Sequence, residues 1–158
     1  VAVAAAAFAW KDYGPLPGKP ETRGSLIFYS ALLAMGGALN LLFTSTDLFT
    51  LYVGLELLTF AAIPVVSLKG SAETLRAALR YLLFAVFGSM LYLLGIVLIY
   101  GSYGTLTVVE VAARVEPNLA MLVAAGLVTV GLLAKTALFP FHLWLPPAHA
   151  GAPAAASQ

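Results

Sequence analysis

Two ionisable residues lie inside long apolar stretches of this chain. Glu56 lies within LFTLYVGLELLTFAAIPVVSL (48–68), and Lys135 lies within LAMLVAAGLVTVGLLAKTALFPFHLWL (119–145). Both stretches are long enough to cross a hydrocarbon core of about 30 Å. An ionisable group at that depth costs roughly 2.5–3.5 kcal/mol on insertion scales, so it is usually kept because it pairs, conducts or binds. Two opposite charges of this kind indicate an ion pathway.

The neighbours of Glu56 add further polar groups to its side of the predicted helix. Tyr52 and Thr59 lie at i−4 and i+3, which places them on the same face. Pro64 has no N–H and leaves the Phe60 carbonyl without its helical partner, so water in a cavity is one candidate donor. The functional interpretation is a protonatable or cation-pairing site. The alternative is a structural carboxyl group bonded to a neighbouring helix.

Lys135 also has two interpretations. Its long stem can extend to the membrane surface if the helix ends near Pro140, which would make it an anchor. Gly131 on its face and Gly126 further back allow a neighbouring helix to approach closely, which favours a functional lysine. Burial favours the neutral forms of Lys135 and Glu56, whereas pairing favours the charged forms. A lysine that alternates between a glutamate and a hydrated cavity would therefore change its proton affinity with conformation.

His142 is the third candidate for proton chemistry. It lies in LFPFHLWLPPAH (138–149), a string with three prolines that predicts a broken or re-entrant segment lining a cavity or packed against protein. Histidine titrates nearest neutral pH, which suggests a proton relay. The alternative is an interfacial histidine beside Trp144 in an aromatic belt. His149 is predicted to be a surface residue.

Composition limits the other classes of function. The chain is 61% hydrophobic and 9% charged, with a net charge of +1, which predicts an integral membrane protein and gives no case for a nucleic-acid partner. It has no cysteine and only two histidines, so we expect no metal site, haem, iron–sulfur cluster or other cofactor. A membrane enzyme acting on lipid or quinone lacks support, because no nucleophile with its base and no phosphate loop is evident.

The apolar stretches predict an all-α membrane protein with about four full transmembrane helices. All-round hydrophobicity over about 20 residues favours helices over barrel strands, which alternate. We interpret the chain as a fragment of a longer protein, because it begins without Met in an apolar run. The expected organisation is the tail of a preceding helix and a loop (1–25), a helix bundle (26–145, with helices about 26–43, 48–68, 75–101 and 119–143), and the approach to a next, broken helix (146–158).

The basic residues predict the orientation in the membrane. Loops 10–25 and 68–80 carry six Lys and Arg residues, whereas 44–47 and 102–118 carry only Arg114. The positive-inside rule places the first two loops in the cytoplasm. We therefore expect a multi-pass protein of the cell (inner) membrane. Ser71, followed by Glu73, and Asn118 are predicted to begin helices.

Three strings resemble one family: DLFTLYVGLELL (47–58), ALRYLLFAVFGSMLYLLGIVLIYGSYGTL (78–106) and LLAKTALFPFHLWLPPAHAGAP (132–153). They are similar to the antiporter-like proton-translocating subunits of respiratory complex I, membrane-bound hydrogenases and multisubunit cation/proton antiporters. The resemblance implies part of a fourteen-helix inverted-repeat fold that works with other membrane subunits and moves protons, or exchanges Na⁺ for protons. It also implies that Glu56 and Lys135 match a paired glutamate and lysine, and that His142 matches a histidine near the same cavity.

Two positions depart from the family pattern. Pro147 stands where an acidic residue usually follows WLP, and APAAASQ (152–158) lacks a second proline. With the string DLFTLYVGLELL, these departures favour the antiporter and hydrogenase branches.

Two functions stay open: a translocating subunit that uses a buried Glu/Lys pair, and a structural or assembly subunit whose buried charges only hold helices together.

Overall fold

The computed structural model describes residues 6–7 and 23–151, and the described part is helical without a named strand. Most of the expected tail of a preceding helix and most of the first loop lie outside the described residues, as does 152–158. The elements that position the site are α2 (Arg23–Thr44), α3 (Leu48–Val66), α4 (Ala72–Tyr103), α5 (Val108–Arg114), α6 (Leu119–Lys135), η1 (His142–Trp144) and α7 (Leu145–Gly151).

The helix lengths confirm an all-α membrane protein. Helices α2, α3 and α4 are each long and apolar enough to span a bilayer. Helix α6 has 17 residues, or about 26 Å at 1.5 Å per residue, which is at the short end for a spanning helix. Large apolar side chains such as Leu33 and Leu122 point outward, as expected of a surface that meets lipid or other apolar helices.

The fourth helix ends earlier than the sequence predicted. The expected helix runs to about residue 143, whereas α6 stops at Lys135. The cause is a left-handed turn, because Ala137 has φ 52° and the Leu138 N–H donates to the Leu133 carbonyl at 3.2 Å. This bond from two residues past the cap closes the helix in the manner of a Schellman motif.

Helix starts follow local capping chemistry. Ser71 accepts from the Thr74 N–H at the start of α4, and Asn118 accepts from the Met121 N–H at the start of α6. Both predicted starts are confirmed. Asp47 caps α3 through two backbone N–H groups, which sequence analysis had not identified. A capping side chain satisfies donors that have no partner inside the helix.

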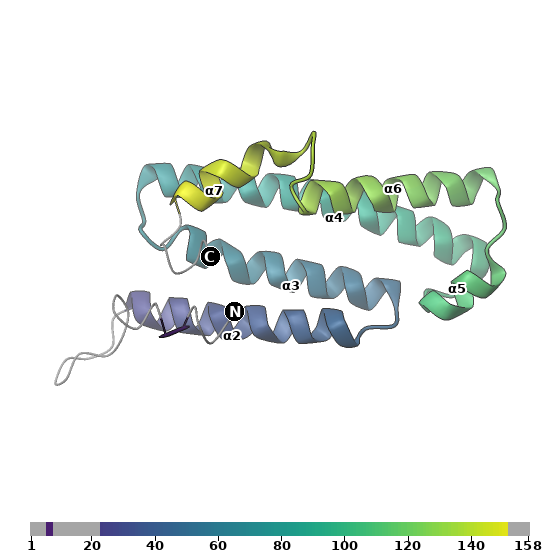
Figure 1. Ribbon diagram of the computed structural model, residues 1–158, viewed down its shortest axis with the longest axis horizontal. Coiled ribbons are helices and arrows are strands. Elements are labelled where there is room, and N and C mark those ends of the chain that lie inside the picture. Colours follow the sequence, from purple (N-terminus) through teal and green to yellow (C-terminus); the bar gives the residue numbers. More distant parts are fainter. Residues whose placement is uncertain (1–5, 8–22, 152–158) are drawn as a thin grey trace.

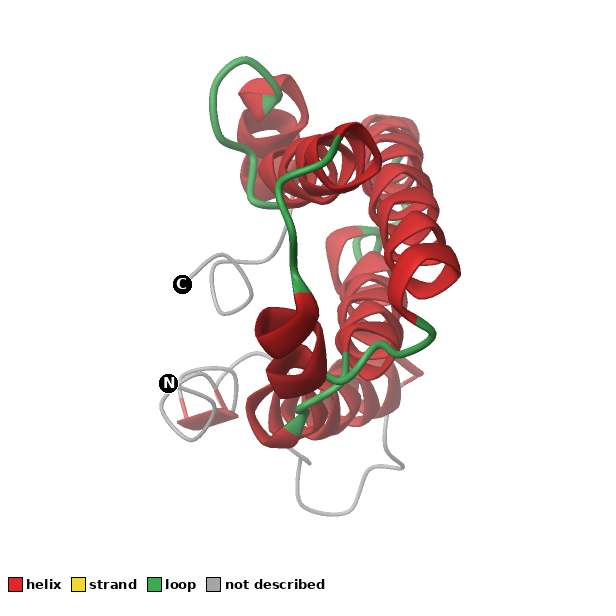
Figure 2. Cartoon of the chain, turned by 90° about the vertical axis from the view of Figure 1, so that its right-hand side faces the viewer, coloured by secondary structure: helices red, strands yellow, loops and turns green. Residues whose placement is uncertain are grey.

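The helices form a row in which α3 lies between α2 and α4, and α6 packs along α4 (Figure 1). Figure 2 shows the same bundle from its end. Helix α7 contacts α4 and α3 near the turn that joins them. At the opposite end, the Leu48 N–H donates to the Leu106 carbonyl at 2.9 Å and the Val108 N–H donates to the Thr46 carbonyl at 3.0 Å, which ties two loops together.

Glycines bring α4 and α6 into backbone contact. A Cβ atom on Gly131 would lie 2.5 Å from the Gly88 carbonyl oxygen and 2.8 Å from the Tyr92 nitrogen. A Cβ atom on Gly95 would meet the Ala124 carbonyl oxygen at 2.8 Å. Such small-residue contacts let membrane helices approach closely. The expected close approach therefore occurs at Gly131.

This contact gives a first prediction, for which Gly126 is a matched control. Gly131→Ala forces two backbones apart and is expected to lower the stability of the protein by about 1–3 kcal/mol, the range for overpacking. Gly126→Ala, in the same helix, meets nothing within 4 Å and is expected to leave stability unchanged or slightly raised. Thermal unfolding of the detergent-solubilised full-length protein measures both. Equal melting temperatures for the two variants would contradict the close packing.

Candidate functional site

The structure brings Glu56 and Lys135 together in a buried ion pair. The Lys135 Nζ lies 2.8 Å from the Glu56 Oε1, and the two side chains are 7% and 16% exposed. Lys135 Nζ also donates to the Thr59 Oγ1 at 3.2 Å and to the Leu55 carbonyl at 3.4 Å. An ammonium group has three donors, so these contacts satisfy all of them within one turn of α3.

Three helices position the pair. Glu56 lies near the middle of α3, and Lys135 is the last residue of α6. Helix α4 lies between them, and the lysine stem passes it at Gly88, where a Cβ atom would come 3.3 Å from Lys135 Cγ. The absence of a side chain at Gly88 therefore leaves the space through which Lys135 reaches α3.

Ser89 is the second partner of the carboxylate. Its hydroxyl is buried and donates to Glu56 Oε1, while the Ala85 carbonyl lies 2.8 Å away as an alternative acceptor. One hydroxyl hydrogen can serve only one acceptor at a time. Ser89 can therefore donate to an ionised Glu56, or turn to Ala85 and accept from a protonated one. This arrangement lets the carboxyl group change its charge without losing a hydrogen-bond partner.

The remaining polar neighbours of Glu56 divide between two roles. Thr59 is buried and contacts the lysine, while its own hydroxyl donates to the Leu55 carbonyl at 2.9 Å. Tyr52 instead stacks on Tyr92, with ring centroids 6.3 Å apart. Tyr92 donates to the Leu48 carbonyl at 3.1 Å, which joins α4 to the first turn of α3. Thr59 therefore belongs to the site, and Tyr52 belongs to the packing beside it.

The two histidines lie apart from the pair. The His142 side chain is exposed in η1, and its ring is 5.9 Å from that of Phe139. His149 is exposed on α7, as expected of a surface residue. Between them, Trp144 is buried, and its Nε1 donates to the Ala134 carbonyl at 3.1 Å. This bond fixes the segment after α6 against the end of the helix that carries Lys135.

Gly88 and Ser89 are not predicted from the sequence, because they lie in an expected span without charge. The available signal was local, since GS at 88–89 is a pair of small residues within a helix of mostly bulky side chains. Neither residue indicates which neighbour it faces, so their part in the site is evident only from the packing of α4.

Across residues 6–7 and 23–151, no three His, Cys, Asp or Glu side chains gather as a metal site would require.

The long apolar helices and the buried ion pair define an integral membrane protein with ionisable groups inside its helix bundle. The family described as NADH:quinone oxidoreductase/Mrp antiporter, TM matches residues 45–158. The chain belongs to this family.

Similar proteins include subunits of NADH-quinone oxidoreductases. The chain is 38% identical over 136 residues to the NADH-quinone oxidoreductase subunit N of Mycobacterium tuberculosis, an alignment that covers 80% of this chain and 25% of that protein. It is 34% identical over 156 residues to subunit N 2 of Solibacter usitatus, covering 96% of this chain and 31% of that protein. The chain thus spans about a quarter to a third of the length of these relatives.

Two solved structures share the fold. A chain of the membrane-bound sulfane sulfur reductase, an archaeal respiratory membrane complex, matches with a TM-score of 0.80 and 25% identity, covering 99% of this chain and 32% of that chain. A chain of respiratory complex I from Thermus thermophilus matches with a TM-score of 0.78 and 28% identity, covering 98% and 33%. The expected resemblance to the family is confirmed, and the preference for the antiporter and hydrogenase branches stays a prediction.

Proposed function

We propose that this chain forms part of a membrane subunit that moves protons, or protons in exchange for Na⁺, across the bilayer. The observation that carries the proposal is the buried contact between Lys135 and Glu56. Pairing stabilises the charged lysine, and burial without a partner favours the neutral one. Separating the pair therefore releases a proton from Lys135, and restoring it recovers one.

The proposed setting is a larger membrane assembly. Named relatives are subunits of an NADH-quinone oxidoreductase, and the structural neighbours come from respiratory complexes. We infer other membrane subunits and the lipid bilayer as partners, with energy from those subunits or from an ion gradient. Three basic residues are exposed at one end of the bundle: Lys69, Arg76 and Arg80. By the positive-inside rule, they support a cytoplasmic position for 68–80, and the basic residues of 10–25 support the same position for that loop. The proposed location is the cell (inner) membrane.

His142 is a further proposed member of the proton path. Imidazole is the side chain whose unperturbed charge change lies nearest neutral pH. Its exposed position after α6 suits a group that exchanges protons with water or with another polar side chain. Its role is separate from that of the ion pair, since no contact joins it to Glu56 or Lys135 in the described part of the chain.

A structural role for the pair is the alternative function, and one experiment separates the two. Inverted membrane vesicles carrying the full native assembly are energised with its driving substrate or a Na⁺ pulse, and a pH-sensitive dye reports the initial rate of proton movement. Rates are divided by the amount of assembled protein on a blot. Glu56→Gln is expected to lower this rate on the order of 10²-fold, the scale on which positioned proton-transfer groups act.

Glu110→Gln is the matched control. Glu110 also forms an ion pair, at 3.9 Å with Arg114, but the side chains of Glu110 and Arg114 are 52% and 57% exposed. Its loss is expected to leave the rate per assembled protein unchanged. If Glu56→Gln lowers only the amount of assembly and leaves the rate per assembled protein intact, the charges are structural and the proposed transport role is wrong.

A further inference from the structure

An apolar groove with a volume of about 320 Å³ runs along α6, at the end of the bundle where α5 lies (Figure 1). Met121, Ala125 and Val128 form one wall, since residues at i, i+4 and i+7 lie on one face of a helix. This wall extends over about two turns, or about 10 Å at 1.5 Å per residue. The groove therefore runs along the axis of α6, the direction in which lipid chains lie beside a spanning helix.

Helix α5 forms another wall of the groove with its apolar face. Val108, Val111 and Ala112 line the groove at i, i+3 and i+4, and Val108 is 43% exposed. Another side of α5 carries Glu110 and Arg114, whose side chains are more than half exposed. A helix with one apolar and one charged face lies at the boundary between headgroups and acyl chains. The outer end of the groove is therefore at the level of the headgroups.

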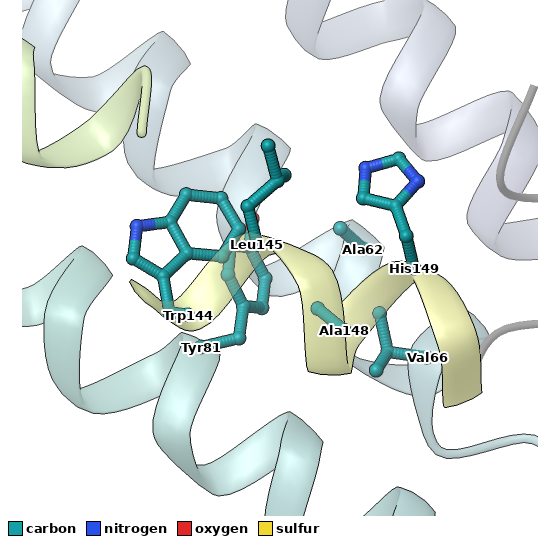
Figure 3. A pocket seen from close by; sticks show the side chains of 7 residues that line it. All are labelled: Ala62, Val66, Tyr81, Trp144, Leu145, Ala148 and His149. Carbon is teal, nitrogen blue, oxygen red and sulfur yellow. The ribbon is translucent and has the colours of Figure 1, made fainter. Parts of the chain in front are cut away.

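The lining of the groove suits a hydrocarbon chain better than water. Nine of its ten lining residues are apolar, and Thr129 is the tenth. An apolar cavity offers water too few polar partners and stays dry. A second cavity differs in this respect, because its wall includes the polar atoms of Tyr81, Trp144 and His149 (Figure 3). An acyl chain of the surrounding lipid is the occupant that matches the groove beside α5.

A cationic and an acidic residue meet where the groove reaches the membrane surface. Tyr103 lies one turn beyond Ile99, which lines the groove, and on the same face of α4. The Tyr103 carbonyl accepts from Arg114 Nη1 at 3.3 Å, and the Tyr103 hydroxyl accepts from the Glu116 N–H at 3.4 Å. Tyrosine itself favours the headgroup level of a membrane. Arg114 and Glu116 are therefore placed to contact a headgroup above the groove.

The charges at this end of the bundle favour a headgroup without net charge. Three acidic residues, Asp47, Glu110 and Glu116, accompany the single basic residue Arg114 in 44–47 and 102–118, so an anionic headgroup meets net repulsion. A zwitterionic headgroup can place its phosphate on the guanidinium and its ammonium group beside a carboxylate. Lipid chains are as apolar as the groove, so the chain alone selects no lipid. The headgroup supplies the selection.

We propose that the groove binds one acyl chain of a zwitterionic phospholipid, with its phosphate on Arg114 and its ammonium group beside Glu116. The lipid belongs to the leaflet opposite the 68–80 end of the bundle. Arg114 has five N–H donors and makes two contacts among the described residues, so donors are left for a phosphate. This lipid site lies apart from the Glu56–Lys135 pair, and it does not depend on the proposed proton transport.

Photo-cross-linking of the full native assembly in liposomes tests the site. The probes are a phosphatidylethanolamine and a phosphatidylglycerol, each with a diazirine on one acyl chain and each at the same low fraction in phosphatidylcholine vesicles. Mass spectrometry locates the labelled peptides, and yields are taken per assembled protein. The zwitterionic probe is expected to label 108–129 about threefold more than the anionic probe, a ratio typical of exposed charge contacts. Equal labelling by the two probes overturns the proposal.

Another segment of the full-length protein is the competing occupant of the groove. If it covers the groove, 108–129 stays unlabelled by both probes while other lipid-facing spans are labelled, and this result also overturns the proposal.

Two neighbouring alanines of α5 give a matched pair for the chain site, because Ala112 lines the groove and Ala113 does not. Ala112→Trp fills the groove and is expected to lower the labelling of 108–129 about tenfold, whereas Ala113→Trp is expected to leave it unchanged. Wild-type labelling in assembled Ala112→Trp overturns the groove as the chain site.

Arg114→Gln tests the headgroup contact without filling the groove, so it stays informative if Ala112→Trp does not assemble. Labelling by the zwitterionic probe is expected to fall about threefold. Arg76→Gln, at the opposite membrane surface, is the control and is expected to leave the labelling of 108–129 unchanged. Wild-type labelling in Arg114→Gln overturns the headgroup contact.

Discussion

Neutralising Glu56 and Lys135 together is expected to cost less stability than the two single neutralisations added. Lys135→Met leaves the Glu56 carboxyl group buried, with Ser89 as its remaining partner among the described residues, and Glu56→Gln leaves a buried ammonium without its counter-charge. A buried polar group that loses its partner costs about 1–3 kcal/mol, and more when it is charged. The double variant removes both charges, so the two changes are expected to couple by about 0.5–3 kcal/mol.

Thermal unfolding of the detergent-solubilised full-length protein measures this coupling. The same cycle on Glu110 and Arg114 is the control, because an exposed pair at 3.9 Å is expected to couple by less than about 1 kcal/mol. Proton transport is expected to stay absent in the Glu56→Gln/Lys135→Met double variant even where its stability recovers. Strictly additive losses at the buried pair would mean that the contact between α3 and α6 contributes no stability.

Lys135→Arg is expected to keep the ion pair and to stop proton movement. A guanidinium group stays charged under all conditions that proteins tolerate, whereas a lysine can release its proton when its environment changes. The arginine can still donate to Glu56 and to the acceptors on α3 that now surround the lysine. If the pair is only structural, Lys135→Arg keeps its function. If Lys135 carries protons, the arginine variant loses that function. We expect the transport rate to fall on the order of 10²-fold or more.

The sequence identifies Glu56 and Lys135 as candidate site residues, but it does not predict the distance between them. Glu56 and Lys135 stand out because each is a charge in an apolar stretch, and the starts of α4 and α6 follow from capping residues that act within one turn. The contact between the two charges depends on α4, which lies between them and carries no charge in that span. The packing of Gly88 against α6 shows that the Lys135 side chain has room to extend past α4 to Glu56.

The end of α6 was not predictable from hydropathy. The residues after Lys135 are still mostly apolar, so the apolar pattern continues where the helix does not. The left-handed turn falls on Ala137, a residue that gives no local signal of such a turn, unlike the glycine that usually marks one.

The most direct test of the proton-carrier account is the initial rate of acidification in inverted vesicles that carry the native assembly with Lys135→Arg. The rate is taken per assembled protein and compared with the wild type under the same driving substrate. The account predicts normal assembly with proton movement reduced to background, because the buried pair persists but Lys135 can no longer release a proton. Normal assembly with a wild-type rate would contradict it and leave the Glu56 contact as a structural ion pair.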